Sequence, residues 1–196
     1  MQDEYTPQEQ AMLLRIAREA LETATAGLPL SLPDLETLPP ALRAERACFV
    51  TLHTTDGALR GCTGVLVARQ PLAHEVARTA VQTAFNDPRF PALQHSELPR
   101  TLIELSLLTP PEPLPFTRSD DLLHLLRPHV DGVIMSIGAR RATFLPQVWE
   151  RVSEPEDFLA LLCQKMGLPP GAWRRGGVQV FTYHTVVIEE ERPTTA

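Results

Sequence analysis

The sequence predicts an α+β fold, with a mainly antiparallel or mixed sheet flanked by helices. Segments of helical periodicity and strand-like segments follow one another in the order α-β-β-α-β-α-β-β-α-β. Two pairs of neighbouring strands are separated by short turn signals that contain glycine, which is typical of hairpins. Because hairpins join antiparallel strands, this order argues against a doubly wound parallel sheet.

The first helix is expected to begin at Thr6 and Pro7 and to end at Gly27. Thr6 and Glu9 have the spacing of a capping box, and Pro7 suits the first turn. Apolar residues then recur at helical spacing: Met12, Leu13, Ile16, Ala17, Ala20 and Leu21. The following stretch, 28–40, contains four prolines and is expected to be an extended connector.

The remaining elements follow from the same kinds of pattern. The expected segments are strands over 46–54 and 58–67, a helix over 71–85, a turn over 86–91, a strand over 101–108, an irregular bridge over 109–115 and a short helix over 119–126. A second hairpin over 131–137 and 141–145 turns at Gly138-Ala139. Pro146 begins a short helix, Ser153 and Glu156 have capping-box spacing for a helix through Met166, and 178–189 form one long final strand.

Composition limits the class of protein. A chain of 196 residues with 43% hydrophobic residues suits one domain, or two small lobes with a shared core. The net charge of −6 disfavours nucleic acid as a partner, because the phosphate backbone rewards a basic surface. The acidic start of the chain does not resemble a secretory signal, and no apolar run is long enough to span a bilayer. We therefore expect a cytoplasmic protein that does not contact a membrane.

The cysteines and histidines give no motif for a metal or cofactor. Three cysteines are too few for a disulfide framework and fit a reducing compartment. The chain has no C-x-x-C, no zinc-binding histidine spacing, no P-loop and no G-x-G-x-x-G. We expect no built-in metal and no cofactor.

The first hairpin carries the best candidate for chemistry, Cys62. If Asp56-Gly57 form a two-residue turn, Thr51 faces Cys62 and His53 faces Arg60. Cations near a thiol favour the thiolate, which would make Cys62 a better nucleophile or ligand. A three-residue loop with a bulge would instead pair Cys62 with Val50, among aliphatic side chains.

Two interpretations of this motif stand side by side. In the first, Cys62 is a presented thiol, Arg60 stabilises its thiolate, and Gly61, Gly64 and His53 line a pocket. In the second, Cys62 is a small buried residue, and the glycines mark a bulge or close packing. Two other cysteines, Cys48 and Cys163, are expected in the core.

Asp87 and Arg89 flank Pro88 just after a predicted helix. They are either a charged pair that borders a pocket, or a helix-terminal turn in which Asp87 accepts backbone hydrogen bonds.

Six short motifs in one order carry a resemblance to a known family. They are Leu-Arg-Gly-Cys-Thr-Gly at 59–64, Phe-Asn-Asp-Pro-Arg-Phe-Pro at 85–91, Ile-Glu-Leu-Ser-Leu-Leu-Thr-Pro at 103–110, Asp-Gly-Val-Ile at 131–134, Leu-Pro-Gln-Val-Trp-Glu at 145–150 and Leu-Cys-Gln-Lys-Met-Gly-Leu at 162–168. Together they resemble the AMMECR domain family, which is protein A of the AmmeMemoRadiSam system. Thr63 stands where the family commonly has isoleucine, and Met166 where it commonly has alanine.

The resemblance implies one domain over 8–190, made of a larger and a smaller lobe with a crevice between them, and terminal tails at 1–7 and 191–196. It also implies that Arg60, Gly61 and Cys62 lie at the site of interest. Relatives are associated with a radical SAM protein and a Memo-like protein, so these are the expected protein partners, beside a small molecule of unknown identity.

Two hypotheses of function follow. The first is a cytoplasmic accessory protein, and by one interpretation an enzyme, whose cysteine-containing site acts with the radical SAM and Memo-like proteins. The alternative is a non-catalytic binding or adaptor module in which the glycine-framed motif shapes a docking groove.

Overall fold

The computed structural model describes residues 5–191 and contains two compact units. The first unit holds residues up to Leu108 and those from Val186 onward, and the second spans Thr109–Thr185. Each unit has its own buried core, and the strands form two four-stranded sheets rather than one. The predicted α+β class is confirmed. Within residues 5–191, no helix combines the length and the apolar composition that a membrane span requires.

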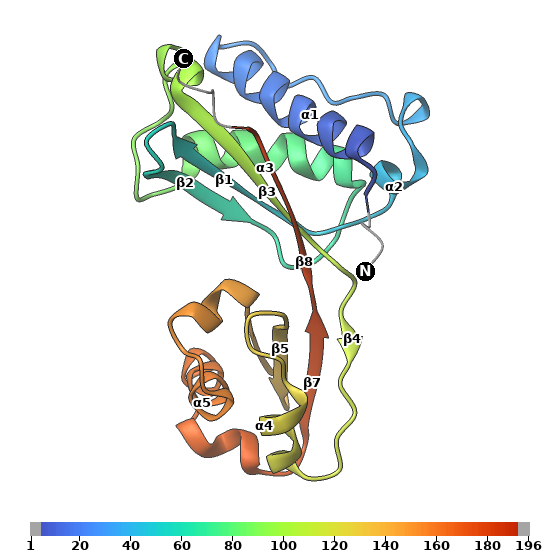
Figure 1. The fold of residues 1–196 in the computed structure, drawn as a ribbon, viewed down its shortest axis with the longest axis vertical. Coiled ribbons are helices and arrows are strands. Elements are labelled where there is room, and N and C mark those ends of the chain that lie inside the picture. The colour runs from blue at the N-terminus through green and yellow to red at the C-terminus, as the bar shows by residue number, and fades with distance from the viewer. Residues whose placement is uncertain (1–4, 192–196) are drawn as a thin grey trace. The chain divides into compact units, whose positions relative to one another are not determined.

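The sheet of the first unit has the strand order β2-β1-β3-β8. Its strands are β1 (Cys48–Thr54), β2 (Leu59–Gly64), β3 (Thr101–Leu108) and β8 (Thr185–Glu189). Two long helices, α1 (Pro7–Thr25) and α3 (Leu72–Asn86), lie on the same face of this sheet (Figure 1). The short helices of the unit are η1 (Leu35–Thr37), α2 (Pro40–Arg43) and η2 (His95–Arg100). The connector predicted over 28–40 therefore includes one short helix and the start of another.

Local sequence explains how these elements form. The Thr6 hydroxyl accepts the backbone N–H of Glu9, and the Glu9 carboxylate accepts the backbone N–H of Thr6, so the predicted capping box of α1 is present. On α3, buried alanines let the helix approach the sheet closely. Alternate residues of β1 face the helices and are fully buried: Cys48, Val50 and Leu52.

The turn of the first hairpin differs from the two-residue prediction. The Thr54 backbone N–H donates to the Ala58 carbonyl, so the loop has three residues and Gly57 adopts a positive φ of 91°. A bulge at Arg60 then shifts the register by one residue, so that His53 pairs with Leu59 and not with Arg60. Loop and bulge offset each other, and the predicted pairing of Thr51 with Cys62 is confirmed.

The second unit is built around a sheet with the order β4-β7-β5-β6. Its elements are β4 (Glu112–Pro113), η3 (Ser119–Asp121), α4 (Leu122–Leu125), β5 (Gly132–Ile137), β6 (Arg140–Phe144), η4 (Pro146–Glu150), α5 (Pro155–Lys165), η5 (Pro170–Arg174) and β7 (Val178–Tyr183). The rings of Trp149 and Phe158 stack with centroids 3.7 Å apart in its core. The predicted hairpin at Gly138-Ala139 is confirmed, with Ile137 paired to Arg140.

Two expectations about the second half of the chain need correction, and the predicted tails lie largely outside the described residues. The long strand predicted over 178–189 is interrupted at His184, and its halves, β7 and β8, belong to different sheets. Helix α5 begins at Pro155 after Glu154, without the capping box predicted from Ser153. The predicted tails lie outside the described residues, except that Tyr5 is buried, Pro7 begins α1 and Glu191 follows β8.

Candidate functional site

Cys62 lies on the sheet face that points away from α1 and α3. Its neighbours on β2, Gly61 and Thr63, contact Thr83 of α3, so alternation turns the Cys62 side chain to the opposite face. Thr51 lies directly across on β1, and its hydroxyl Oγ1 donates to Cys62 Sγ at 3.3 Å. The Cys62 side chain is partly exposed, whereas Cys48 and Cys163 are fully buried, as predicted.

Two titratable side chains share this face. Thr51 pairs with Cys62 on one side and with Glu104 of β3 on the other, so the three residues form a row across three strands. His53, two residues along β1, lies with Nε2 3.4 Å from Glu104 Oε2. Both side chains are about a third exposed, at 32% and 27%. A thiol, a hydroxyl and a histidine–carboxylate pair thus lie on one side of the sheet.

The backbone of Cys62 is held from outside the sheet. Strand β2 is an edge strand, and the Cys62 backbone N–H donates to Asp87 Oδ2 at 2.8 Å. Arg89 Nη2 donates to the Cys62 carbonyl at 3.0 Å. Asp87 and Arg89 therefore satisfy backbone groups that an edge strand would otherwise leave without a strand partner.

Asp87 and Arg89 also bind each other. Arg89 Nη2 lies 2.7 Å from Asp87 Oδ2, and Arg89 Nε lies 2.9 Å from Oδ1. The Asp87 side chain is 2% exposed and the Arg89 side chain 54%. The hydrogen bonds from Arg89 hold the pKa of Asp87 well below its usual range against the opposing effect of burial, and the Cys62 amide adds to the lowering. Beside their mutual ion pair, Asp87 and Arg89 thus form a clamp on the Cys62 backbone.

The two glycines of the motif are required by packing. A Cβ at Gly61 would lie 3.0 Å from Thr83 Cγ2 and 3.1 Å from the Thr83 carbonyl oxygen. A Cβ at Gly64 would overlap the Phe49 ring and lie 2.6 Å from the carbonyl oxygen of Cys48. Gly61 thus lets β2 approach α3, and Gly64 lets the end of β2 approach β1.

Arg60 is paired elsewhere. Its Nε and Nη2 donate to the two carboxylate oxygens of Glu97 at 2.9 and 3.1 Å, in a bidentate ion pair. The Arg60 side chain is 11% exposed, and the pair joins the bulge of β2 to η2. Arg89, not Arg60, is the cation with a described contact to Cys62.

The sequence analysis missed Glu104, Thr51 as a hydrogen-bond donor, and Glu97. Glu104 had a signal: it is a carboxylate inside the apolar strand 101–108, where alternation places it on the face opposite the core. No sequence signal pointed to Glu97, because its pairing with Arg60 depends on how η2 lies against the hairpin.

A cavity of about 440 Å³ borders the histidine–carboxylate pair. His53, Leu102 and Glu104 form one part of its wall, and Glu189, Glu190 and Glu191 form another. Within residues 5–191, no three histidine, cysteine or acidic side chains are grouped so that they could hold a metal ion.

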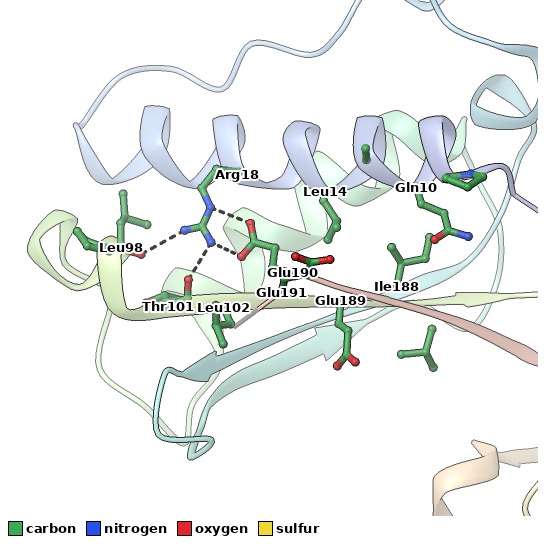
Figure 2. A pocket seen from close by; sticks show the side chains of 14 residues that line it. Gln10, Leu14, Arg18, Leu98, Thr101, Leu102, Ile188, Glu189, Glu190 and Glu191 are labelled. Atoms are coloured by element: carbon green, nitrogen blue, oxygen red, sulfur yellow. Dashed lines mark hydrogen bonds and ion pairs between the residues drawn. The ribbon is translucent and has the colours of Figure 1, made fainter. Parts of the chain in front are cut away.

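A larger hollow of about 830 Å³ lies along α1 and β8 (Figure 2). Arg18 reaches across it from α1 to pair with Glu190, and donates to the carbonyls of Leu98 and Thr101 at 3.3 and 2.8 Å. Glu190 also accepts the backbone N–H of Ile103 at 2.9 Å. These hydrogen bonds and the ion pair join α1 to the sheet, which is a structural role. Because no cysteine lines this hollow, we place the candidate site at Cys62.

Comparison with known proteins identifies the family of this fold. The family model AMMECR1 matches residues 14–188. The chain belongs to the AMMECR1 family. Protein MJ0810 of Methanocaldococcus jannaschii is 35% identical over 190 residues, which cover 96% of this chain and 93% of that protein. A protein of Methanothermobacter thermautotrophicus is 39% identical over 181 residues, with 91% and 93% covered.

A solved AMMECR1 relative shares the fold. The crystal structure of the uncharacterized protein PH0010 from Pyrococcus horikoshii matches with a TM-score of 0.82 and 31% identity, over 98% of this chain and 97% of that one. The predicted membership in the AMMECR family is therefore confirmed. Because the names of these relatives state no activity, the function of this AMMECR1 domain has to be argued from its site.

Proposed function

We propose that this AMMECR1 domain is a cytoplasmic accessory protein whose site presents a reactive thiol, Cys62. In this proposal it works with a radical SAM protein and a Memo-like protein, the partners that the family resemblance implies. Cys62 acts as the nucleophile or acceptor for a small molecule. His53 and Glu104 lie on the same face, and Asp87 and Arg89 hold the strand in place.

The observation that carries the proposal is that the Cys62 backbone is held on both sides while the residue stays partly exposed. Its backbone N–H and carbonyl are both bonded to the Asp87–Arg89 pair, and its sulfur accepts a hydroxyl hydrogen bond from Thr51. The thiolate is the nucleophilic form of cysteine, and the Thr51 hydroxyl and the Arg89 guanidinium both contact Cys62. A fixed nucleophile also loses little conformational freedom when it reacts.

The experiment measures alkylation of all three cysteines by iodoacetamide, site by site, by mass spectrometry. At pH 7 we expect Cys62 to react faster than a free cysteine derivative, and Cys48 and Cys163 to stay unmodified in the folded protein. Burial raises the pKa of the Cys48 thiol to about 12, and it also raises that of Cys163, so both serve as internal controls. A Cys62 rate equal to or below that of the model thiol would contradict the proposal.

A second candidate function is a binding module without chemistry. It is favoured by the packing roles of Gly61, Gly64 and Asp87, which explain most of the motif without a reaction. Here Cys62→Ser should leave partner binding and cellular function intact, whereas a bulky residue at Gly61 should abolish both. Loss of function in a folded Cys62→Ser protein that still binds its partners would reject this module.

A further inference from the structure

We infer that His53 and Glu104 form the acid–base pair that takes the proton from Cys62. This inference rests on the proposed function, because it assigns the group that activates the same thiol. It joins three strands of one sheet: Cys62 from β2, His53 from β1 and Glu104 from β3.

The strand register puts His53 within reach of Cys62 through one intervening molecule. Thr51 is directly opposite Cys62, and His53 lies two residues further along β1 on the same face. Diagonal neighbours of this kind are about 7–8 Å apart in antiparallel sheets. The imidazole of a histidine and one bridging water, or the reactant itself, span such a distance.

Glu104 gives His53 the partner that a histidine base needs. Its Oε2 lies 3.4 Å from Nε2 of His53, so the carboxylate orients the ring and stabilises the imidazolium that forms. Among the described residues, Nδ1 of His53 has no hydrogen bond, so this nitrogen is available to accept a proton. A cavity of about 440 Å³ borders His53 and Glu104, and both side chains are about a third exposed, so water can reach the pair.

The step conserves charge. The S–H bond of Cys62 breaks with its electron pair left on sulfur, the proton passes to Nδ1 of His53, and a thiolate and an imidazolium result. Glu104 of β3 lies beside the imidazolium, and Glu189 and Glu191 line the same cavity, whereas the Glu190 carboxylate points to Arg18 of α1 (Figure 2). Arg18 neutralises Glu190, and Glu97 neutralises Arg60, so Arg89 is the described cation beside the thiolate.

The test is the pH profile of Cys62 alkylation by iodoacetamide between pH 5.5 and 9.5, in the full chain. We expect His53→Gln to lower the rate at pH 7 about tenfold and to move the rise of the profile by about one pH unit toward alkaline pH. Glu104→Gln should shift the profile in the same direction by a smaller amount. His124→Gln and Glu112→Gln, which change exposed residues of the second unit, are the matched controls and should leave the profile unchanged.

Each outcome separates the two proposals. A fast Cys62 with an unchanged profile in folded His53→Gln and Glu104→Gln overturns the acid–base pair and leaves the reactive thiol standing. A slow Cys62 in the wild-type protein overturns the reactive thiol and the pair with it.

A second measurement covers the case in which the His53 variant does not fold. Nuclear magnetic resonance can follow the His53 ring against pH in the wild-type and Cys62→Ser proteins. We expect the midpoint of His53 to fall in Cys62→Ser, because the thiolate that stabilises the imidazolium is lost. An identical midpoint in both proteins overturns the pair.

Discussion

Asp87 accepts the backbone N–H of Cys62 at 2.8 Å, although the two residues are 25 positions apart. Asp87 follows the last residue of α3, and Cys62 lies on the edge strand β2, so this hydrogen bond fixes the strand to the end of the helix. With Arg89 on the carbonyl side, both polar groups of the Cys62 backbone are held. The clamp therefore sets the position of the thiol through the backbone that carries it.

The first prediction concerns the stability that this clamp provides. Asp87→Asn removes the buried charge that binds Arg89, and we expect the free energy of unfolding to fall by about 2–4 kcal/mol. Urea denaturation at pH 7, followed by circular dichroism, measures the loss. Asp157→Asn, which changes an exposed carboxyl on α5, is the control and should alter stability by less than about 0.5 kcal/mol.

The second prediction concerns how the stability of the folded protein changes at acid pH. The pKa of Asp87 is lowered in the folded protein, so the ionised carboxylate contributes to the free energy of unfolding. This contribution is fully present above the pKa of an unfolded aspartate, about 3.9, and is lost as the pH falls below that value. We expect the urea midpoint to drop between pH 5 and pH 2, and to drop less in Asp87→Asn. Equal drops in both proteins would show that other carboxyls cause the acid sensitivity, such as Glu97, whose pKa the ion pair with Arg60 lowers.

The third prediction concerns the glycines. Gly64→Ala forces a methyl group into the Phe49 ring and the Cys48 carbonyl, and we expect it to destabilise the protein by about 3 kcal/mol or to prevent folding. Gly61→Ala, with contacts of 3.0 and 3.1 Å, should cost about 1–2 kcal/mol. Gly176→Ala is the control, since nothing lies within 4 Å of its Cβ position. Thermal melts rank the variants, and a Gly64→Ala protein as stable as the control would contradict the packing argument.

The fourth prediction separates the two arginines near the motif. Arg60 is occupied by Glu97, so Arg60→Gln should change the alkylation rate of Cys62 less than twofold in folded protein. Arg89→Gln removes the guanidinium bonded to the Cys62 carbonyl, and we expect a several-fold slower reaction at low ionic strength. The alkylation rates of both variants are measured with iodoacetamide at pH 7. A larger loss of rate in Arg60→Gln than in Arg89→Gln would contradict the prediction and indicate that Arg60 is the cation that acts on the thiol.

Local signals predicted much of the fold because they act over a few residues. The capping box of Thr6 and Glu9, the alternation along β1 and the turn at Gly138 can all be recognised in the sequence, and the structure contains them. The break of the final strand at His184 had no such signal. The segment 178–189 is β-favouring throughout, and only its partners divide it between two sheets.

The sequence by itself determined the fold class, the family and the residue types of the motif, because periodicity, turn chemistry and residue order are properties of the chain. The register around Cys62 needed the tertiary structure, since a three-residue loop and a bulge offset each other. So did the partners of the charged residues: Asp87 and Arg89 hold the Cys62 backbone, Arg60 binds Glu97, and Glu104 lies beside His53. These contacts join residues far apart in sequence, and packing of helices against the sheet decides which charges meet.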